Sequence, residues 1–170
     1  MRVMAEIVLL TVFPGVVLFA AAMDLFTMTI PNRLSLALVA AFVLFAPFMG
    51  LGPWAMASHF GAGLLVLAGG VLLFIPGWIG GGDAKLAAAV ALWLGFDHVL
   101  IFLICAALAG GSLATTILAL RQMPLPAVVA TQPWAARLHS RGGGIPYGIA
   151  LAVGALWVYP QTAWFTGLAG

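Results

Sequence analysis

Charged side chains are scarce in this chain. Of its 170 residues only 6% are charged, six of them basic and four acidic, whereas 65% are hydrophobic. A soluble domain of this length cannot keep so much apolar surface away from water. The composition excludes an ordinary soluble protein and predicts a single membrane-embedded domain over residues 1–170.

Cysteine and histidine are scarce too. The single cysteine, Cys105, excludes an internal disulfide and a multi-cysteine metal site. The three histidines, His59, His98 and His139, fall in separate loops or helix ends, which predicts neither a metal cluster nor a nucleophile–base pair. Six scattered basic residues are no phosphate-binding patch. We therefore expect no metal, no cofactor and no nucleic-acid partner.

Long apolar runs fill the rest of the chain. A transmembrane helix needs about 20 mostly apolar residues, and six stretches approach this length. Glycine, proline and polar residues separate them. The sequence predicts an all-α polytopic membrane protein, a bundle of about six transmembrane helices near residues 4–23, 34–51, 58–79, 84–97, 99–120 and 144–160.

The basic residues predict the orientation of this bundle. With six spans and the N-terminus outside (periplasmic), only Arg2 lies on the outer side. Five basic residues face the cytoplasm, as the positive-inside rule requires: Arg33, Lys85, Arg121, Arg137 and Arg141. Four aromatic residues should then lie at the outer interface, where amphipathic rings are common: Trp54, Trp157, Tyr159 and Trp164.

The first helix has a second interpretation. Arg2, the apolar stretch after it and Ala20-Ala21-Ala22 resemble a secretory signal peptide. The charge distribution alone does not decide between an uncleaved helix and a cleaved signal peptide, because cleavage would leave the cytoplasmic loops unchanged. We expect an uncleaved helix, since cleavage would separate Asp24 from it.

Two of the four acidic residues share one membrane edge. Asp24 is expected to close the first helix and Asp83 to open the fourth, both at the cytoplasmic side. Ionisable residues at membrane helices are costly and are functional candidates. Two carboxyl groups within hydrogen-bond reach hold one proton between them. The ionised group can then activate water while the protonated group donates to a scissile carbonyl.

Structural explanations exist for each residue taken singly. Asp83 follows Gly80-Gly81-Gly82 and can be a helix N-cap, and Asp24 can mark the water boundary of its helix. The matched depth of the two aspartates and the glycine run favour a functional pair. Glycines elsewhere are expected to allow close helix packing: Gly61, Gly63, Gly69, Gly70, Gly110, Gly111 and Gly154.

These motifs resemble the type IV prepilin peptidases, which are Gly-x-Gly-Asp membrane aspartic peptidases. Gly80-Gly81-Gly82-Asp83 is similar to the signature, and the Ala-Lys-Leu after it to the prepilin peptidase version. Asp24 with Ile30-Pro31-Asn32 resembles the first catalytic motif, and Ile145-Pro146-Tyr147-Gly148 the motif that opens the last helix. The resemblance covers nearly the whole chain, and its compact form is similar to the peptidases of Cpa/Tad (Flp) pilus systems.

The resemblance implies a bacterial inner-membrane enzyme that cleaves prepilin and pseudopilin leader peptides at the cytoplasmic face. It makes Asp24 and Asp83 the catalytic residues. Further residues are implied to bind substrate or shape the site: Gly80, Gly82, Lys85, Pro31, Asn32, Pro146 and Tyr147. Because the loop after the first helix lacks the cysteine-containing insertion of the longer members, we expect peptidase without N-methyltransferase activity.

Two other functions remain open from the residues alone. A small transporter or proton channel would use Asp24 and Asp83 as a relay, although a relay should reach across the bilayer. A noncatalytic pilus-assembly scaffold would need neither aspartate. Asn substitutions at both positions separate these alternatives from a peptidase.

Overall fold

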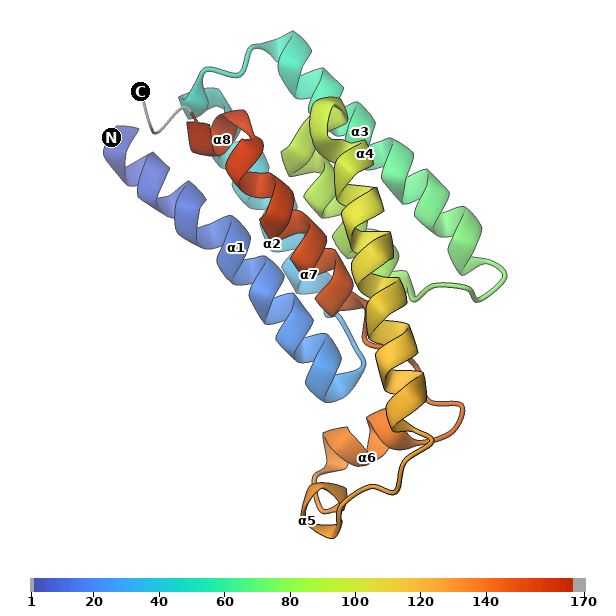
Figure 1. Ribbon diagram of the computed structural model, residues 1–170. Helices are drawn as coiled ribbons and strands as arrows, with labels where there is room; N and C mark the ends of the chain where they lie inside the picture. The colour runs from blue at the N-terminus through green and yellow to red at the C-terminus, as the bar shows by residue number, and fades with distance from the viewer. Residues whose placement is uncertain (1, 167–170) are drawn as a thin grey trace.

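The computed structural model describes residues 2–166, and these residues form helices joined by short connections (Figure 1). In chain order the elements are α1 (Arg2–Thr27), α2 (Asn32–Phe45), η1 (Ala46–Met49), α3 (Pro53–Phe74), α4 (Gly81–Leu120), α5 (Ala127–Ala130), α6 (Pro133–His139), α7 (Tyr147–Val158), η2 (Tyr159–Gln161) and α8 (Ala163–Thr166). The prediction of an all-α protein is confirmed.

Four of these helices are long and apolar enough to cross a membrane. The candidate spans are Leu10–Thr27, Asn32–Met49, Pro53–Phe74 and Gly81–Leu120. Their outward faces carry large apolar side chains, such as Leu72 at 70% exposure and Leu100 at 68%. Such surfaces are suited to lipid and not to water. The chain is therefore a multi-pass helical membrane protein.

The longest helix, α4, is two antiparallel halves joined at Gly95. The backbone there has φ of 68° and ψ of 179°, outside the helical region. In a straight helix Asp83 and Ala106 would lie about 35 Å apart, yet both line one cavity of about 430 Å³. The predicted fourth and fifth spans are thus present. The break predicted at Asp97-His98 is wrong, because the glycine two residues earlier supplies the positive φ that the reversal needs.

The first half of α4 lies inside the bundle, and residues 86–95 are all buried. α4 packs against α2, α3 and α7, while α1 packs on α2 and α7. Small residues let these helices approach closely: a Cβ at Gly70 would lie 2.8 Å from the Cβ of Ala84, and one at Gly63 would lie 3.2 Å from the Ala88 carbonyl oxygen. The predicted close packing does not hold for Gly69 and Gly111, where a Cβ would meet nothing within 4 Å.

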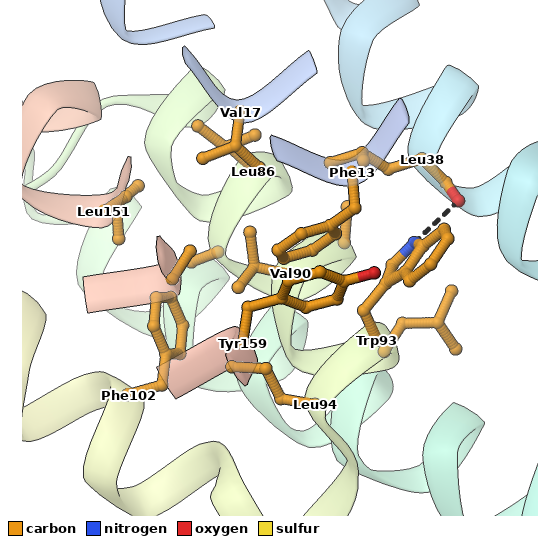
Figure 2. Packing of buried hydrophobic residues seen from close by; sticks show 14 of the residues in the cluster. Phe13, Val17, Leu38, Leu86, Val90, Trp93, Leu94, Phe102, Leu151 and Tyr159 are labelled. Atoms are coloured by element: carbon orange, nitrogen blue, oxygen red, sulfur yellow. Dashed lines mark hydrogen bonds between the residues drawn. The ribbon is translucent and has the colours of Figure 1, made fainter. Parts of the chain in front are cut away.

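An aromatic cluster fills the core at the end of the bundle where α1 starts. Phe13 stacks on Tyr159 with ring centroids 4.4 Å apart, and the Phe13 ring also packs against Trp93 with centroids 5.1 Å apart (Figure 2). The Trp93 indole N–H donates to the Leu38 carbonyl oxygen at 2.9 Å. In turn, the Trp164 indole N–H donates to the Trp93 carbonyl oxygen at 2.6 Å. These bonds tie α2, α4 and α8 together.

Two of the four predicted interfacial aromatics belong to this core instead. Trp54 and Trp157 are 87% and 70% exposed, whereas Tyr159 and Trp164 are each 2% exposed. The difference arises because η2 and α8 turn back after α7, so that α8 covers the end of the bundle (Figure 1). The interfacial prediction is wrong for Tyr159 and Trp164.

Candidate active site

Asp24 lies near the end of α1 and faces the first turn of α7. The helix continues to Thr27, so the prediction that Asp24 closes it is wrong by one turn. The carboxyl group is buried, with the residue 6% exposed. Its Oδ2 accepts a hydrogen bond from the Gly148 backbone N–H at 2.7 Å. This N–H belongs to the first turn of α7, where backbone donors lack partners within the helix and the helix dipole favours negative charge.

Asp83 lies in the first turn of α4, three residues after the N-cap. The N-cap is Gly80, so the expectation that Asp83 opens the helix is off by two residues. The Asp83 side chain reaches back and accepts a hydrogen bond from the Gly80 backbone N–H, as the acidic residue of a capping box does. Its other oxygen, Oδ1, is buried and has no hydrogen-bond partner among the residues that the structure describes. A buried carboxyl oxygen without a partner is rare in folded proteins and calls for a functional explanation.

The structure brings Asp24 and Asp83 together although they are far apart in the chain. Their carboxyl groups are close enough to repel each other electrostatically. Ile30, in the connection between α1 and α2, lies close to both Gly148 and Gly82. A Cβ at Gly148 would lie 3.0 Å from Ile30 Cδ1, and a Cβ at Gly82 would lie 3.0 Å from Ile30 Cβ. The two aspartates thus share one end of the bundle, away from the start of α1 (Figure 1).

The two glycines of the signature have separate steric roles. A Cβ at Gly80 would lie 2.6 Å from the Asp83 Oδ2, so a side chain there would displace the carboxyl group. Gly82 lets the start of α4 approach Ile30. Close packing therefore explains Gly82.

Pro31, Asn32 and Lys85 lie together beside the site. Pro31 is the N-cap of α2, with φ of −62° and ψ of 135°. The Lys85 ammonium donates to the Asn32 side-chain oxygen at 3.0 Å, which links the first turns of α2 and α4. Both side chains are exposed. Asp83 and Lys85 line different cavities, as residues two positions apart on a helix do not face each other.

Pro146 and Tyr147 open α7. Pro146 is the N-cap and is fully buried. The Tyr147 ring packs over Gly110 in the second half of α4, where a Cβ would lie 2.2 Å from the ring. The Tyr147 hydroxyl group is 3.4 Å from the Ala106 carbonyl oxygen. Gly110 is thus the residue that makes room for Tyr147.

Asp83 and Tyr147 line the cavity of about 430 Å³ between α3, both halves of α4 and α7. Its other walls are apolar: Leu65, Val66, Gly69, Gly70, Leu73, Ile79, Ala84, Ala87, Val99, Leu103, Ala106 and Leu151. The combination of an apolar chamber and one polar group with a free oxygen is typical of a small-molecule or side-chain binding site.

Two arginines hold the segment between α4 and α7 against this end of the bundle. Arg121 donates to the carbonyl oxygens of Leu138 at 2.6 Å, Gly143 at 2.9 Å and Gly144 at 3.0 Å. Arg137 donates to the Phe26 carbonyl oxygen in the last turn of α1, where a cation complements the helix dipole. The sequence predicted only that these arginines lie on the cytoplasmic side, and neither contact.

Sequence reasoning also missed the role of Gly148. The residue was visible as the last member of Ile145-Pro146-Tyr147-Gly148, yet only the structure shows its N–H bound to Asp24. The signal was available, since a glycine in the first turn of a helix leaves its N–H accessible from the side. Gly110 carried no comparable signal.

Comparison with known proteins identifies one relationship. Residues 11–115 match the sequence model of the type IV leader peptidase family. The match spans α1 to α4 and includes both aspartates. Neither a curated protein nor a solved structure matches the chain significantly.

Proposed function

Because the chain belongs to the type IV leader peptidase family, we propose that it is an aspartic endopeptidase that removes the leader peptides of Flp-type prepilins. The family implies peptidase activity and prepilin leaders as substrates. The aspartic mechanism, the Flp-type substrate, and a single peptidase domain over residues 1–170 are our proposals.

The observation that carries the proposal is the meeting of Asp24 and Asp83. Both carboxyl groups are withdrawn from water, they interact electrostatically, and Asp83 Oδ1 has no partner. Two carboxyl groups that interact in this way are expected to share a single proton, because neighbouring like charges do not both ionise easily. Asp83 also lines the apolar chamber of about 430 Å³, which supports binding of a substrate beside the pair.

The proposed reaction needs only this pair. The ionised carboxyl group removes a proton from water as the water attacks the scissile carbonyl carbon, and the protonated carboxyl group donates to the carbonyl oxygen. The tetrahedral intermediate then collapses, and its C–N bond breaks as the amine takes a proton. The Gly148 N–H fixes Asp24 Oδ2 and leaves the other oxygen of Asp24 for chemistry.

The charges at this end of the bundle support a cytoplasmic active site in the bacterial inner membrane. Lys85, Arg121 and Arg137 make their contacts at the same end as the aspartates. Positive residues mark the cytoplasmic ends of spans, so the start of α1 lies on the periplasmic side in this proposal.

The α1–α2 connection favours a peptidase without methyltransferase activity. α1 ends at Thr27 and α2 begins at Asn32, so the connection is shorter still than the sequence suggested. Four residues hold no additional domain between these helices.

Cleavage of a co-expressed prepilin tests the proposal directly. Asp24→Asn and Asp83→Asn keep the size of the side chain but do not exchange a proton, and each should slow cleavage at least about 100-fold. Asp97→Asn is the matched control, because Asp97 is exposed and follows the Gly95 reversal at the other end of the bundle. Normal processing by either site variant would overturn the mechanism. Proton flux through vesicles, lost in Asp24→Asn without any leader cleavage by the wild type, would instead indicate a channel.

A further inference from the structure

A second cavity lies on the other side of α4 from the Asp83 chamber. It is a groove of about 460 Å³ between α2, α3 and the first half of α4. Its rim carries Leu36 and Leu64, each 64% exposed, so it opens to the lipid-facing surface. The proposed peptidase reaction does not use it.

The polar groups of the groove all lie at one end. Lys85 and Asn32 stand at its mouth, and Ser35 follows one helical turn deeper on α2. From there to Val39, Phe60 and Leu92 the walls are apolar. The Lys85 ammonium contacts the neutral amide oxygen of Asn32, a contact that leaves its charge uncompensated.

Ser35 is the independent sign of a ligand. It lines the groove, it is only 8% exposed, and its hydroxyl oxygen is buried with no hydrogen-bond partner among the described residues. A buried hydroxyl group without a partner costs free energy. An acceptor that enters the groove from the Lys85 end would relieve that cost.

The dimensions of the groove decide what fits. Its lining runs from residue 32 to 39 on α2, 60 to 67 on α3 and 85 to 92 on α4, about 10 Å along each helix. A cavity of about 460 Å³ over this length takes a single straight hydrocarbon chain.

We propose that this groove binds one acyl chain of an anionic phospholipid, with the phosphate at Lys85 and Asn32 and the ester carbonyl at Ser35. Basic pockets between transmembrane helices bind anionic headgroups in this way. The Ser35 hydroxyl group donates to the ester oxygen, and the chain lies along Leu36, Leu67 and Ala89. The lipid is a component of the surrounding membrane, and its binding does not depend on peptidase activity.

Native mass spectrometry of the full chain tests the proposal. The protein is released from nanodiscs of phosphatidylcholine doped with phosphatidylglycerol of the same acyl chains, and the retained lipids are counted. Because one basic residue near a membrane surface contributes about 1 kcal/mol, we expect about fivefold preferential retention of phosphatidylglycerol. Lys85→Gln should abolish this preference, and Ser35→Ala should lower retention of both lipids.

Matched variants separate the groove from the general surface. Arg33→Gln removes an exposed charge at the same membrane edge outside the groove lining, and should keep the preference. Leu67→Phe and Val39→Phe, from opposite walls, should expel both lipids, while Leu72→Phe on the outward surface of α3 should not. Thermal melting checks that each variant is folded.

The wild type supplies a test that needs no substitution. Phosphatidylglycerol with methyl-branched phytanyl chains is wider than the straight-chain lipid and should be retained less in a groove that takes one straight chain. Equal retention of the two, or an equal loss of preference in Arg33→Gln and Lys85→Gln, would overturn the proposal. Displacement of phosphatidylglycerol by an uncharged transmembrane peptide would also overturn it, because the groove would then be a helix-docking surface.

Discussion

Gly148→Ala is the most specific test of how Asp24 is positioned, because it changes the surroundings of the carboxyl group without removing an ionisable group. The added Cβ would lie 2.9 Å from Asp24 Oδ2, 3.0 Å from Asp24 Cβ and 3.0 Å from Ile30 Cδ1. Contacts between carbon and oxygen are ordinarily about 3.3–3.6 Å. Asp24 or the start of α7 must therefore move by several tenths of an ångström, and the 2.7 Å hydrogen bond from Gly148 is strained or lost.

The size of the effect follows from that bond. A hydrogen bond to a charged group contributes about 1.5–3 kcal/mol, and a displacement of about 1 Å in a catalytic group costs about 100-fold in rate. We expect kcat for leader-peptide cleavage to fall about 10- to 100-fold. KM should change little, because the new methyl group faces Asp24 and does not line the cavity that holds Asp83.

The assay compares Gly148→Ala with Gly144→Ala in cleavage of a purified prepilin in detergent. Gly144 precedes α7 in the same segment, and a Cβ there would meet nothing within 4 Å, so this control should cleave at the wild-type rate. Thermal melting verifies that both variants fold. If folded Gly148→Ala also cleaves at the wild-type rate, the Gly148–Asp24 contact does not position the catalytic group.

Three further predictions concern the supports of the site. Gly110→Ala would place a Cβ 2.2 Å from the Tyr147 ring. It should lower the rate of cleavage and the melting temperature, and reduce the free energy of unfolding by about 1–3 kcal/mol. In the adjacent Gly111→Ala the new Cβ meets nothing within 4 Å, so this variant should stabilise α4 by up to about 1 kcal/mol. Trp93→Phe removes the donor to the Leu38 carbonyl oxygen and should lower the free energy of unfolding by about 1–3 kcal/mol, measured by denaturant titration. Arg121→Ala removes the donor to the Leu138, Gly143 and Gly144 carbonyl oxygens and should speed limited proteolysis of residues 122–144. Arg121→Lys should be intermediate, because an ammonium group lacks the planar fork of a guanidinium group. Unchanged proteolysis in Arg121→Ala would show that Arg121 does not hold this segment in place.

The sequence was informative where one residue type has one strong physical preference. Apolar length predicted the four long helices that could cross a membrane, and the rarity of acidic residues directed attention to Asp24 and Asp83. It was less informative where two partners from distant segments decide the outcome. Tyr159 and Trp164 carry the same amphipathic rings as Trp54 and Trp157, and only the fold of η2 and α8 buries them.

The predicted helix boundaries were inaccurate for a related reason. The polar pair Asp97-His98 marked the region of the reversal but not its position. The turn is made by Gly95, whose backbone adopts a φ of 68° while Gly110 and Gly111 stay helical. The carbonyl contacts of Arg121 and Arg137 join positions 17 to 111 residues apart. Pairings of this kind depend on the packed arrangement of the helices, which mixed apolar runs do not encode.

The reversal at Gly95 has a consequence for how the chain enters the membrane. Only one residue separates the two halves of α4, so no hydrophilic loop exists that could be translocated between them. We therefore expect the 40-residue segment Gly81–Leu120 to enter the membrane as a hairpin. A reporter domain fused into this turn would separate the two halves and should impair insertion.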